Sequence, residues 1–288
     1  MQILATLLSL IHLGLKGSSP LVVPDVIGTN NFGQYFVEAR LNGQKIVLNI
    51  DTGSQASYIK DKCFVKGGSW QVSTLHGTIA VHLRSFSEGK ITLDNKFGAD
   101  GLLGLNAFQD RILGLDLAND CISFWPPKTD LLEAAYYWFT HTYQLTPKRI
   151  RKWEMIPPQD RLHYQTTIAF FKPQKDYDGM VVIPGEVLGV KVDLLLDTGT
   201  MVFVVPASLE PTLIPTGTMQ LARGSSPSAP SRARRYKLNG IELPIAGPSV
   251  SVGLDESDVV VGTIALKSLK VLYDLKTGSA LVSWRQNK

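Results

Sequence analysis

The segment LNGQKIVLNIDTGSQASYI, residues 41–59, recurs as VLGVKVDLLLDTGTMVFVV, residues 187–205. In both segments a short apolar run, 44–50 or 190–196, ends in Asp-Thr-Gly and is followed by a hydroxyl residue and a second apolar run. Short apolar runs bounded by glycines are typical of β-strands. The pattern therefore predicts two copies of one strand–turn–strand unit.

A second repeat follows each copy. The segment ADGLLGLNAFQDRILGLDLANDCISF, residues 99–124, matches SDVVVGTIALKSLKVLYDLKTGSALV, residues 257–282. The first two segments are 146 residues apart and the second two are 158 residues apart, so the second copy is 12 residues longer between its motifs. Two matches in the same order indicate a duplicated unit. A structural β domain with two coincidental Asp-Thr-Gly turns would not show the second match.

The two aspartates of the repeat are the candidate catalytic residues. A duplicated unit can bring Asp51 and Asp197 to its two-fold axis, within hydrogen-bonding distance of one water molecule. Two carboxylates at that separation cannot both ionise easily, so the pair holds one proton. The ionised carboxylate can then take a proton from the water while the protonated one donates to a carbonyl under attack. This chemistry needs neither a metal ion nor an organic cofactor, and we expect none.

The residues after each aspartate are expected to support the pair. The glycines permit a tight turn in which a backbone N–H approaches the carboxylate. The threonines next to the aspartates can hydrogen-bond across the axis, and the hydroxyl residues after the glycines can orient the carboxylates. The expected supporting residues are Thr52, Gly53, Ser54, Thr198, Gly199 and Thr200.

These motifs resemble those of the pepsin-like and retropepsin-like aspartic proteases. The matching elements are Asp51-Thr52-Gly53-Ser54 and Asp197-Thr198-Gly199-Thr200, with Leu102-Leu103-Gly104 and Val260-Val261-Gly262 later in each copy. The resemblance implies an all-β, bilobal, pseudo-two-fold fold of two small barrel-like lobes, with a polypeptide substrate in the cleft between them. It implies aspartic endopeptidase activity. The alternative is a protein that keeps this fold and binds peptides, in a regulatory role, with little or no turnover.

The chain departs from the pepsin-like pattern in two respects. The lobes are short and closer in size to a retropepsin protomer, and both lie in one chain, so a homodimer is not required. Residues 60–100 contain no tyrosine, so a flap tyrosine has no counterpart there. The candidate flap is the hairpin around His76, Gly77 and Thr78, although His76 can equally be an ordinary turn residue. The equivalent hairpin of the second copy is expected near residues 222–236.

The repeats divide the chain into segments. We expect an N-terminal lobe over residues 20–125, a connection with one helix over 126–162, and a C-terminal lobe over 163–288. The aromatic residues of the helix are expected to pack between elements rather than bind a ligand. The segment 222–236 is rich in Ser, Pro and Arg, which predicts a surface loop.

The first 19 residues contain an apolar run from Ile3 to Leu15. A run of this length is too short to span a bilayer comfortably and is typical of a secretory signal peptide. A membrane anchor or a hydrophobic N-terminal strand is the alternative. We therefore expect a secreted or cell-envelope (periplasmic) protein whose contact with a membrane, if any, is made by this segment.

Composition excludes several other classes. Hydrophobic residues make up 44% of the chain and charged residues 19%, which excludes a disordered chain. The net charge of +4 is too small to indicate a nucleic-acid partner. The two cysteines, Cys63 and Cys121, lack the spacing of a metal site and are either one disulfide or two thiols.

Overall fold

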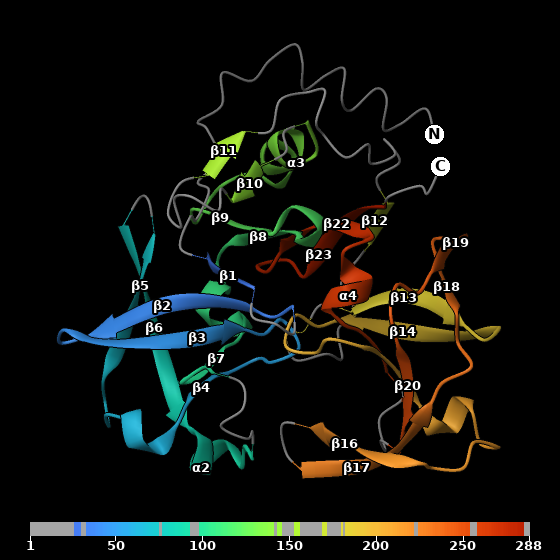
Figure 1. Ribbon diagram of the computed structural model, residues 1–288. Helices are drawn as coiled ribbons and strands as arrows, with labels where there is room; N and C mark the ends of the chain where they lie inside the picture. The colour runs from blue at the N-terminus through green and yellow to red at the C-terminus, as the bar shows by residue number, and fades with distance from the viewer. Residues whose placement is uncertain are drawn as a thin grey trace.

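The computed structural model describes residues 26–29, 33–74, 77–92, 98–140, 143–145, 153–155, 169–171, 180, 182–221, 224–253 and 258–284. This part of the chain is predominantly β-structure, which confirms the all-β class expected from the sequence (Figure 1). The predicted strands 44–50 and 190–196 are both present with those bounds. Residues 1–19, on which the prediction of export rests, lie outside the described residues.

One sheet is built by the first copy. Its strands run in the order β1-β2-β3-β7-β4-β6-β5, and β2 also pairs with β5, which closes the sheet on itself. A short helix, α2 (Phe86–Gly89), follows β6. The strands are β1 (Val26–Thr29), β2 (Tyr35–Leu41), β3 (Gln44–Ile50), β4 (Ser57–Ile59), β5 (Ser69–Thr74), β6 (Gly77–Ser85) and β7 (Gly101–Leu103).

The second copy builds a second sheet in the order β16-β17-β20-β15-β21-β14-β13-β18-β19. A short helix, α4 (Thr263–Leu266), follows its last strand. The strands are β13 (Val182–Val187), β14 (Val190–Leu196), β15 (Phe203–Pro206), β16 (Gly217–Leu221), β17 (Gly224–Pro230), β18 (Arg235–Leu238), β19 (Ile241–Pro244), β20 (Ser249–Val252) and β21 (Val259–Val261).

The two sheets repeat the same pairings around the Asp-Thr-Gly turns. In the first copy β3 runs parallel to β7, while β4 is antiparallel to β7 and parallel to β6. In the second copy β14 runs parallel to β21, while β15 is antiparallel to β21 and parallel to β20. The duplication inferred from the sequence is therefore also a duplication of strand topology.

The copies differ in two connections. The second copy inserts the hairpin β16–β17 between β15 and β18, where the first copy has only the short connection between β4 and β5. The first copy has a longer connection between β6 and β7, which contains α2, than the second has between β20 and β21. The second copy is thus 12 residues longer between its motifs because its longer connection before β18 is partly offset by its shorter connection before β21.

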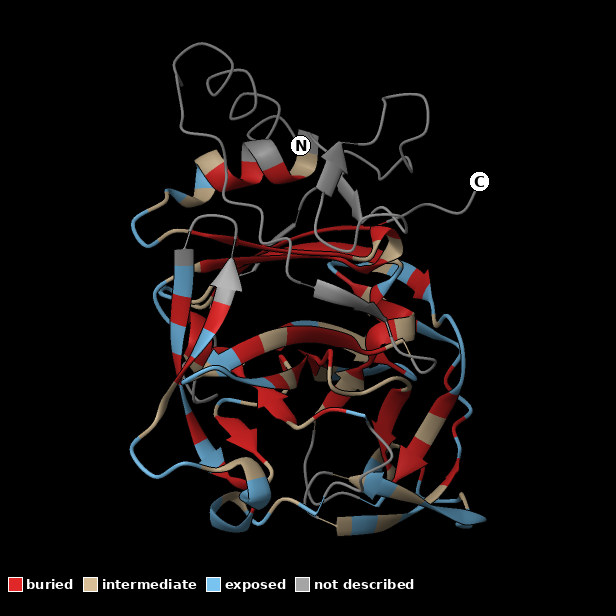
Figure 2. Cartoon of the chain, turned by 60° about the vertical axis from the view of Figure 1, so that its left-hand side comes forward, coloured by how far each residue is buried: buried red, intermediate tan, exposed pale blue. Residues whose placement is uncertain are grey.

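A third sheet joins the copies. Its order is β12-β23-β22-β8-β9, and the central pair β22–β8 brings Val271 opposite Leu115 across the two copies. Four of its strands are strongly buried (Figure 2). They are β8 (Ile112–Asp116), β9 (Cys121–Trp125), β12 (Ala169–Phe171), β22 (Leu269–Asp274) and β23 (Ser279–Trp284), with a separate hairpin of β10 (Tyr143–Leu145) and β11 (Trp153–Met155).

The predicted helix is present as α3 (Leu131–Thr140). It begins after Asp130, whose carboxylate accepts hydrogen bonds from the backbone N–H groups of Leu132 and Glu133. The indole of Trp138 packs edge-on against Trp125 of the joining sheet, with ring centroids 5.5 Å apart. Phe139 packs against the same buried cluster, so both described aromatic side chains of the helix have the packing role expected for them. None of the helices in the described ranges is long and apolar enough to cross a membrane.

The prediction of a surface loop over residues 222–236 is wrong about the loop, although Ser225, Pro227 and Arg232 are exposed at the surface. Residues 224–230 form β17, which pairs with β16 and β20, and Tyr236 is buried within β18. Ala229 and Ala233 are also buried. Pairing and the burial of small side chains outweigh the polar composition, because tertiary context decides strand formation.

Cys63 and Cys121 are free thiols, so the disulfide alternative is not formed. Burial raises the pKa of both thiols, and the nearby Asp116 carboxylate raises that of Cys121 further. Neither thiol has the lowered pKa of a reactive cysteine.

Candidate active site

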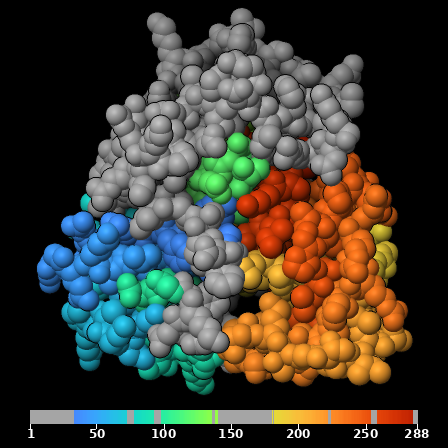
Figure 3. All heavy atoms as spheres, in the orientation of Figure 1, coloured from blue at the N-terminus to red at the C-terminus, as the bar shows by residue number. Residues whose placement is uncertain are grey.

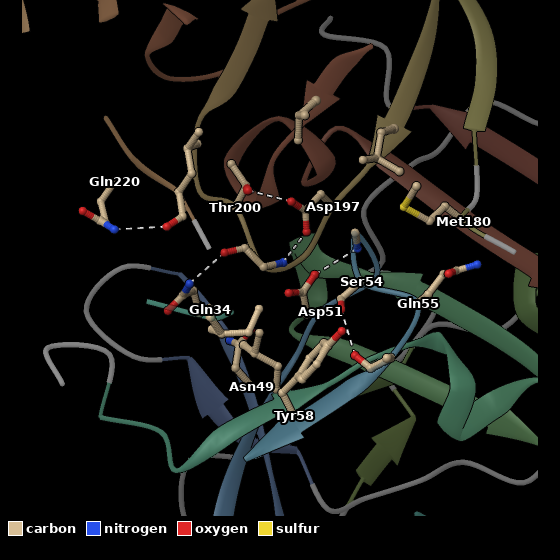
Figure 4. Close-up of a pocket in the computed structure, with 18 of the residues that line it drawn as sticks. Gln34, Asn49, Asp51, Ser54, Gln55, Tyr58, Met180, Asp197, Thr200 and Gln220 are labelled. Atoms are coloured by element: carbon tan, nitrogen blue, oxygen red, sulfur yellow. Dashed lines mark hydrogen bonds between the residues drawn. The ribbon is translucent and has the colours of Figure 1, made fainter. Parts of the chain in front are cut away.

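The two Asp-Thr-Gly turns meet where the copies come together. Asp51 directly follows β3 and Asp197 directly follows β14, and Figure 4 shows their carboxyl groups facing one another. The backbone N–H of Asp51 donates to the carbonyl of Leu103 at 3.0 Å, and that of Asp197 donates to Val261 at 3.1 Å. The strands β7 and β21 therefore hold the two turns in equivalent positions.

Reciprocal hydrogen bonds between threonines lock the turns together. The backbone N–H of Thr52 donates to the Thr198 hydroxyl at 3.1 Å, and the N–H of Thr198 donates to the Thr52 hydroxyl at 3.0 Å. Each hydroxyl also donates to a backbone carbonyl of the opposite strand, Leu196 or Ile50, at 2.6 Å. Both threonines are buried, so these bonds are shielded from competing water.

Gly53 and Gly199 lie where there is no room for a side chain. The N–H of Gly53 donates to Asp51 at 3.0 Å, and the N–H of Gly199 donates to Asp197 at 2.7 Å. A Cβ atom at either glycine would lie 2.7 Å from Oδ1 of the opposite aspartate. The missing side chains therefore allow each turn to approach the carboxylate of the other copy closely.

The later glycines of the repeat support the turns from behind. The residues that follow Gly104 and Gly262 donate backbone hydrogen bonds of 2.8 Å to the carbonyls of Ser54 and Thr200. A Cβ atom at Gly104 would lie 2.7 Å from the Ser54 carbonyl, and one at Gly262 would lie 2.8 Å from that of Thr200. Only glycine allows this contact between β7 or β21 and the adjacent turn.

The two hydroxyl residues do not act alike. Thr200 donates to Oδ2 of Asp197 at 2.6 Å, which is the orienting role expected of it. Ser54 instead donates to the carbonyl of Ala56, two residues further on, at 2.8 Å. Serine hydroxyls often bond to nearby backbone in this way. Ser54 therefore does not orient Asp51, and the two carboxyl groups have different surroundings.

The two carboxyl groups of the pair differ in how strongly their surroundings favour the protonated form. Burial, together with the charge of Asp197 and a hydrogen bond to it, raises the pKa of Asp51 well above its ordinary value. The Gly53 N–H opposes this shift in part. Asp197 accepts hydrogen bonds from Gly199 and Thr200, both of which stabilise an ionised carboxylate. The surroundings of Asp51 therefore favour its protonated form, and Asp197 is the carboxyl group with two hydrogen-bond donors.

The carboxyl groups lie in a cleft of about 1470 Å³ that is lined by residues of both copies. The copies lie side by side in Figure 3, the first in blue to green and the second in orange to red. The first copy contributes Phe86 and Ile91 from α2 and the segment after it, and the second contributes Met219 and Gln220 from the β16–β17 hairpin. The two unequal connections of the fold therefore both contribute to the cleft.

Only part of the candidate flap of the first copy, Gly77 and Thr78, lies within the described residues. His76 lies outside the described residues. Gly77 and Thr78 pair with Thr74 and Ser73 at the beginning of β6 and are not among the cleft-lining residues that the structure describes. In Figure 1 this end of β5 and the β16–β17 hairpin lie on opposite sides of the molecule.

The strand pairings show where the hairpins of the two copies lie in their sheets. The β5–β6 hairpin pairs with β2, as the β18–β19 hairpin pairs with β13, so these two hairpins occupy equivalent places in the two copies. The hairpin that does line the cleft is β16–β17, which overlaps the region expected for the second copy.

Two polar cleft residues were not expected from the sequence. Gln34 is buried and donates from Nε2 to the carbonyl of Gly199 at 2.9 Å, and Asn49 lies on β3 two residues before Asp51. Asn49 is an amide inside an otherwise apolar strand end, and its counterpart in the second copy is Leu195. A comparison of the two copies position by position could have drawn attention to it.

No protein-family model matches the chain, and no curated protein matches it. Within the described ranges no group of three or more His, Cys, Asp or Glu side chains is placed to hold a metal ion.

Proposed function

We propose that the protein is an aspartic endopeptidase with Asp51 and Asp197 as its catalytic residues. The observation that carries the proposal is the pair of facing carboxyl groups, one with a strongly raised pKa, in a cleft large enough for a peptide. The reciprocal bonds of Thr52 and Thr198 support it further, because they hold the pair rigidly at the contact of the two copies. The bilobal aspartic protease fold, with two short lobes in one chain, is part of this proposal.

The chemistry follows from the different surroundings of the two carboxyl groups. A water molecule held between them loses a proton to the ionised Asp197 and attacks the carbonyl carbon of the scissile amide. Asp51 gives its proton to the carbonyl oxygen, which forms a tetrahedral intermediate. When the intermediate collapses, the proton held by Asp197 goes to the leaving amine, and the hydroxyl proton returns to Asp51. The pair then again holds one proton, and no covalent enzyme intermediate is needed.

Residues around the pair have positioning roles in this scheme. Thr200 keeps the ionised carboxylate of Asp197 in place, and the N–H groups of Gly53 and Gly199 fix the inner oxygens of both groups. Gln34 holds the carbonyl of Gly199 from the first copy. Preorganisation of this kind lowers the reorganisation needed when the water attacks. Since one chain supplies both aspartates, the site does not require a second chain.

The proposal is tested by incubating the purified protein with denatured casein from about pH 3 to about pH 8, the range in which a shared-proton pair can be half ionised. Mass spectrometry of the products should show internal cleavage, and a chelator in parallel should not change it. Intact casein at every pH, from protein shown by circular dichroism to be folded, would favour the alternative of a peptide-binding protein with little turnover.

A further inference from the structure

The two copies carry different chemistry at equivalent positions beside the catalytic pair. Seventeen residues before each aspartate stand Gln34 in the first copy and Met180 in the second, and two residues before each aspartate stand Asn49 and Leu195. All four line the cleft. Equivalent positions in a duplicated unit lie on opposite sides of its axis. One side of the cleft floor is therefore built from amides and the other from apolar side chains.

The side-chain oxygen of Asn49 is a buried acceptor without a hydrogen-bond donor among the described residues. Its side chain is 2% exposed, and its Nδ2 donates to the carbonyl of Tyr35 at 3.3 Å. Because that carbonyl can only accept, the amide nitrogen must face it and Oδ1 faces away. In the described part of the chain Oδ1 has no hydrogen-bond partner. A buried acceptor without a donor is unfavourable, so a ligand that supplies a donor here gains affinity.

Gln34 makes the same side of the cleft polar and rigid. It is 2% exposed, and its bond to the Gly199 carbonyl fixes it beside the catalytic turn, next to Asn49 in Figure 4. A charged ligand group placed beside Gln34 and Asn49, each only 2% exposed, would lose most of its hydration, which is costly. The donor that suits Asn49 is therefore an uncharged N–H or O–H group.

The opposite side offers apolar contact. Leu195 is 9% exposed and Met180 is partly buried, and neither carries a strong hydrogen-bonding group. Gln55 lies beside Met180 in Figure 4 but is exposed, so it belongs to the rim of the cleft and not to its floor. A polar side chain placed here would lose its water without compensation.

We propose that the cleft selects peptides in which an uncharged polar residue and an apolar residue flank the scissile bond. Asn, Gln, Ser or Thr would contact Asn49 and Gln34 on one side, and an apolar side chain would contact Met180 and Leu195 on the other. This inference rests on the proposed endopeptidase activity and names its substrate class. The polar–apolar pairing is a property of this cleft because the two copies differ at these positions.

The first test is the sequence preference of cleavage in a library of peptides from a digested proteome, read by mass spectrometry. The expected result is enrichment of Asn, Gln, Ser and Thr at one of the two flanking positions and of apolar residues at the other. The same preference at both positions, or none at either, would overturn the inference while leaving the activity itself established.

Substitutions at residues 49 and 195 test whether the floor of the cleft causes this preference. Two peptides that differ only by Gln or Met at the polar position are compared by their ratio of kcat/KM. The wild-type protein should cleave the Gln peptide with the higher kcat/KM. In Asn49→Leu the ratio of kcat/KM for the Gln peptide to that for the Met peptide should fall by about tenfold or more, since one buried hydrogen bond is lost. Leu195→Asn should increase tolerance of Gln at the other position. Gln71→Leu, which removes an exposed amide of β5 outside the cleft, should change neither ratio.

A ratio that is the same in the wild-type protein and in Asn49→Leu would contradict the inference. If no peptide is cleaved, the proposed activity fails, and the same library is passed over the immobilised wild-type protein. Retained peptides should then pair an uncharged polar residue with an adjacent apolar one, and the Asn49→Leu protein should not retain them. Retention without that pairing, or no retention at all, would overturn the inference independently of catalysis.

Discussion

The hydroxyl groups of Thr52 and Thr198 each accept a hydrogen bond from the backbone N–H of the other residue, at 3.0 and 3.1 Å. Each hydroxyl also donates to a carbonyl of the opposite copy, so neither has an unused donor proton. This closed set of four bonds joins the copies directly beneath the carboxyl groups. The separation of Asp51 and Asp197 is therefore set by buried hydrogen bonds between threonine hydroxyls and the backbone, and not by side chains of the open cleft.

Removing one of these hydroxyls should destabilise the fold. In Thr52→Val the shape of the side chain is kept, but the N–H of Thr198 and the carbonyl of Leu196 are left without their partner. The free energy of unfolding should fall by about 1–3 kcal/mol per buried group left unpaired. Urea unfolding measures it, with Thr78→Val on the exposed face of β6 as the control. An equal change in the two variants would show that the threonine bonds add no stability.

Asp51→Asn should make the folded protein more stable at neutral pH. The pKa of Asp51 is raised above its ordinary value of 3.8, so the folded state holds a proton that the unfolded state has released. Its contribution to stability is present below about pH 4 and is lost as the pH rises toward the raised pKa. Asparagine does not ionise and avoids that loss.

Thermal unfolding at several pH values measures this effect. The melting temperature of Asp51→Asn should equal that of the wild type near pH 4 and exceed it increasingly as the pH rises. Asp110→Asn, at an exposed carboxylate, is the control. A difference between Asp51→Asn and wild type that shrinks with rising pH would contradict the placement of the proton on Asp51.

Thr200→Val and Ser54→Ala should differ in their pH profiles. Thr200 donates to Asp197, whereas Ser54 donates to Ala56. Loss of the Thr200 hydroxyl removes a bond that stabilises the ionised form of the pair, so the acidic limb of kcat/KM should move to higher pH. Ser54→Ala should leave that limb in place. The same displacement in both variants would mean that the two hydroxyls act alike during catalysis.

Gly199→Ala should impair the site while Gly217→Ala should not. A Cβ atom at residue 199 would lie 2.7 Å from both oxygens of Asp51, and one at residue 217 would meet only the Ser228 hydroxyl at 4.0 Å. Displacing the carboxylate should lower kcat/KM by roughly 10²-fold or more. Comparable activity of the two variants on casein would show that the turn can yield without moving the pair.

The repeat predicted part of this arrangement. The strand ends before the Asp-Thr-Gly turns follow from residues within a few positions of each other. The contact of Thr52 with Thr198 joins residues 146 positions apart, and it could be predicted only because the repeat gives the two turns equivalent places in the duplicated unit. The expected approach of the glycine N–H groups to the carboxylates is present, and the structure adds a close approach of each glycine to the opposite carboxylate, which the sequence did not predict.

Other features depend on contacts that the sequence does not show. The hydroxyl of Ser54 can rotate toward either a carboxylate or a carbonyl, and only the position of Ala56 decides between them. The Ser- and Pro-rich strand β17 forms because β16 and β20 lie on either side of it. The contribution of α2 and the segment after it to the cleft was likewise not predicted, because a net difference of 12 residues conceals that the first copy has the longer connection between β6 and β7.

The central claim is that Asp51 and Asp197 together hydrolyse peptide bonds, and the most direct measurement is casein hydrolysis by Asp197→Asn at the optimal pH of the wild type. Asparagine keeps the shape of the side chain and cannot act as the base, so the rate should fall by roughly 10²- to 10⁴-fold, while Asp110→Asn stays near the wild-type rate. Circular dichroism should show that all three proteins are folded. Wild-type activity in Asp197→Asn would contradict the catalytic role of the pair.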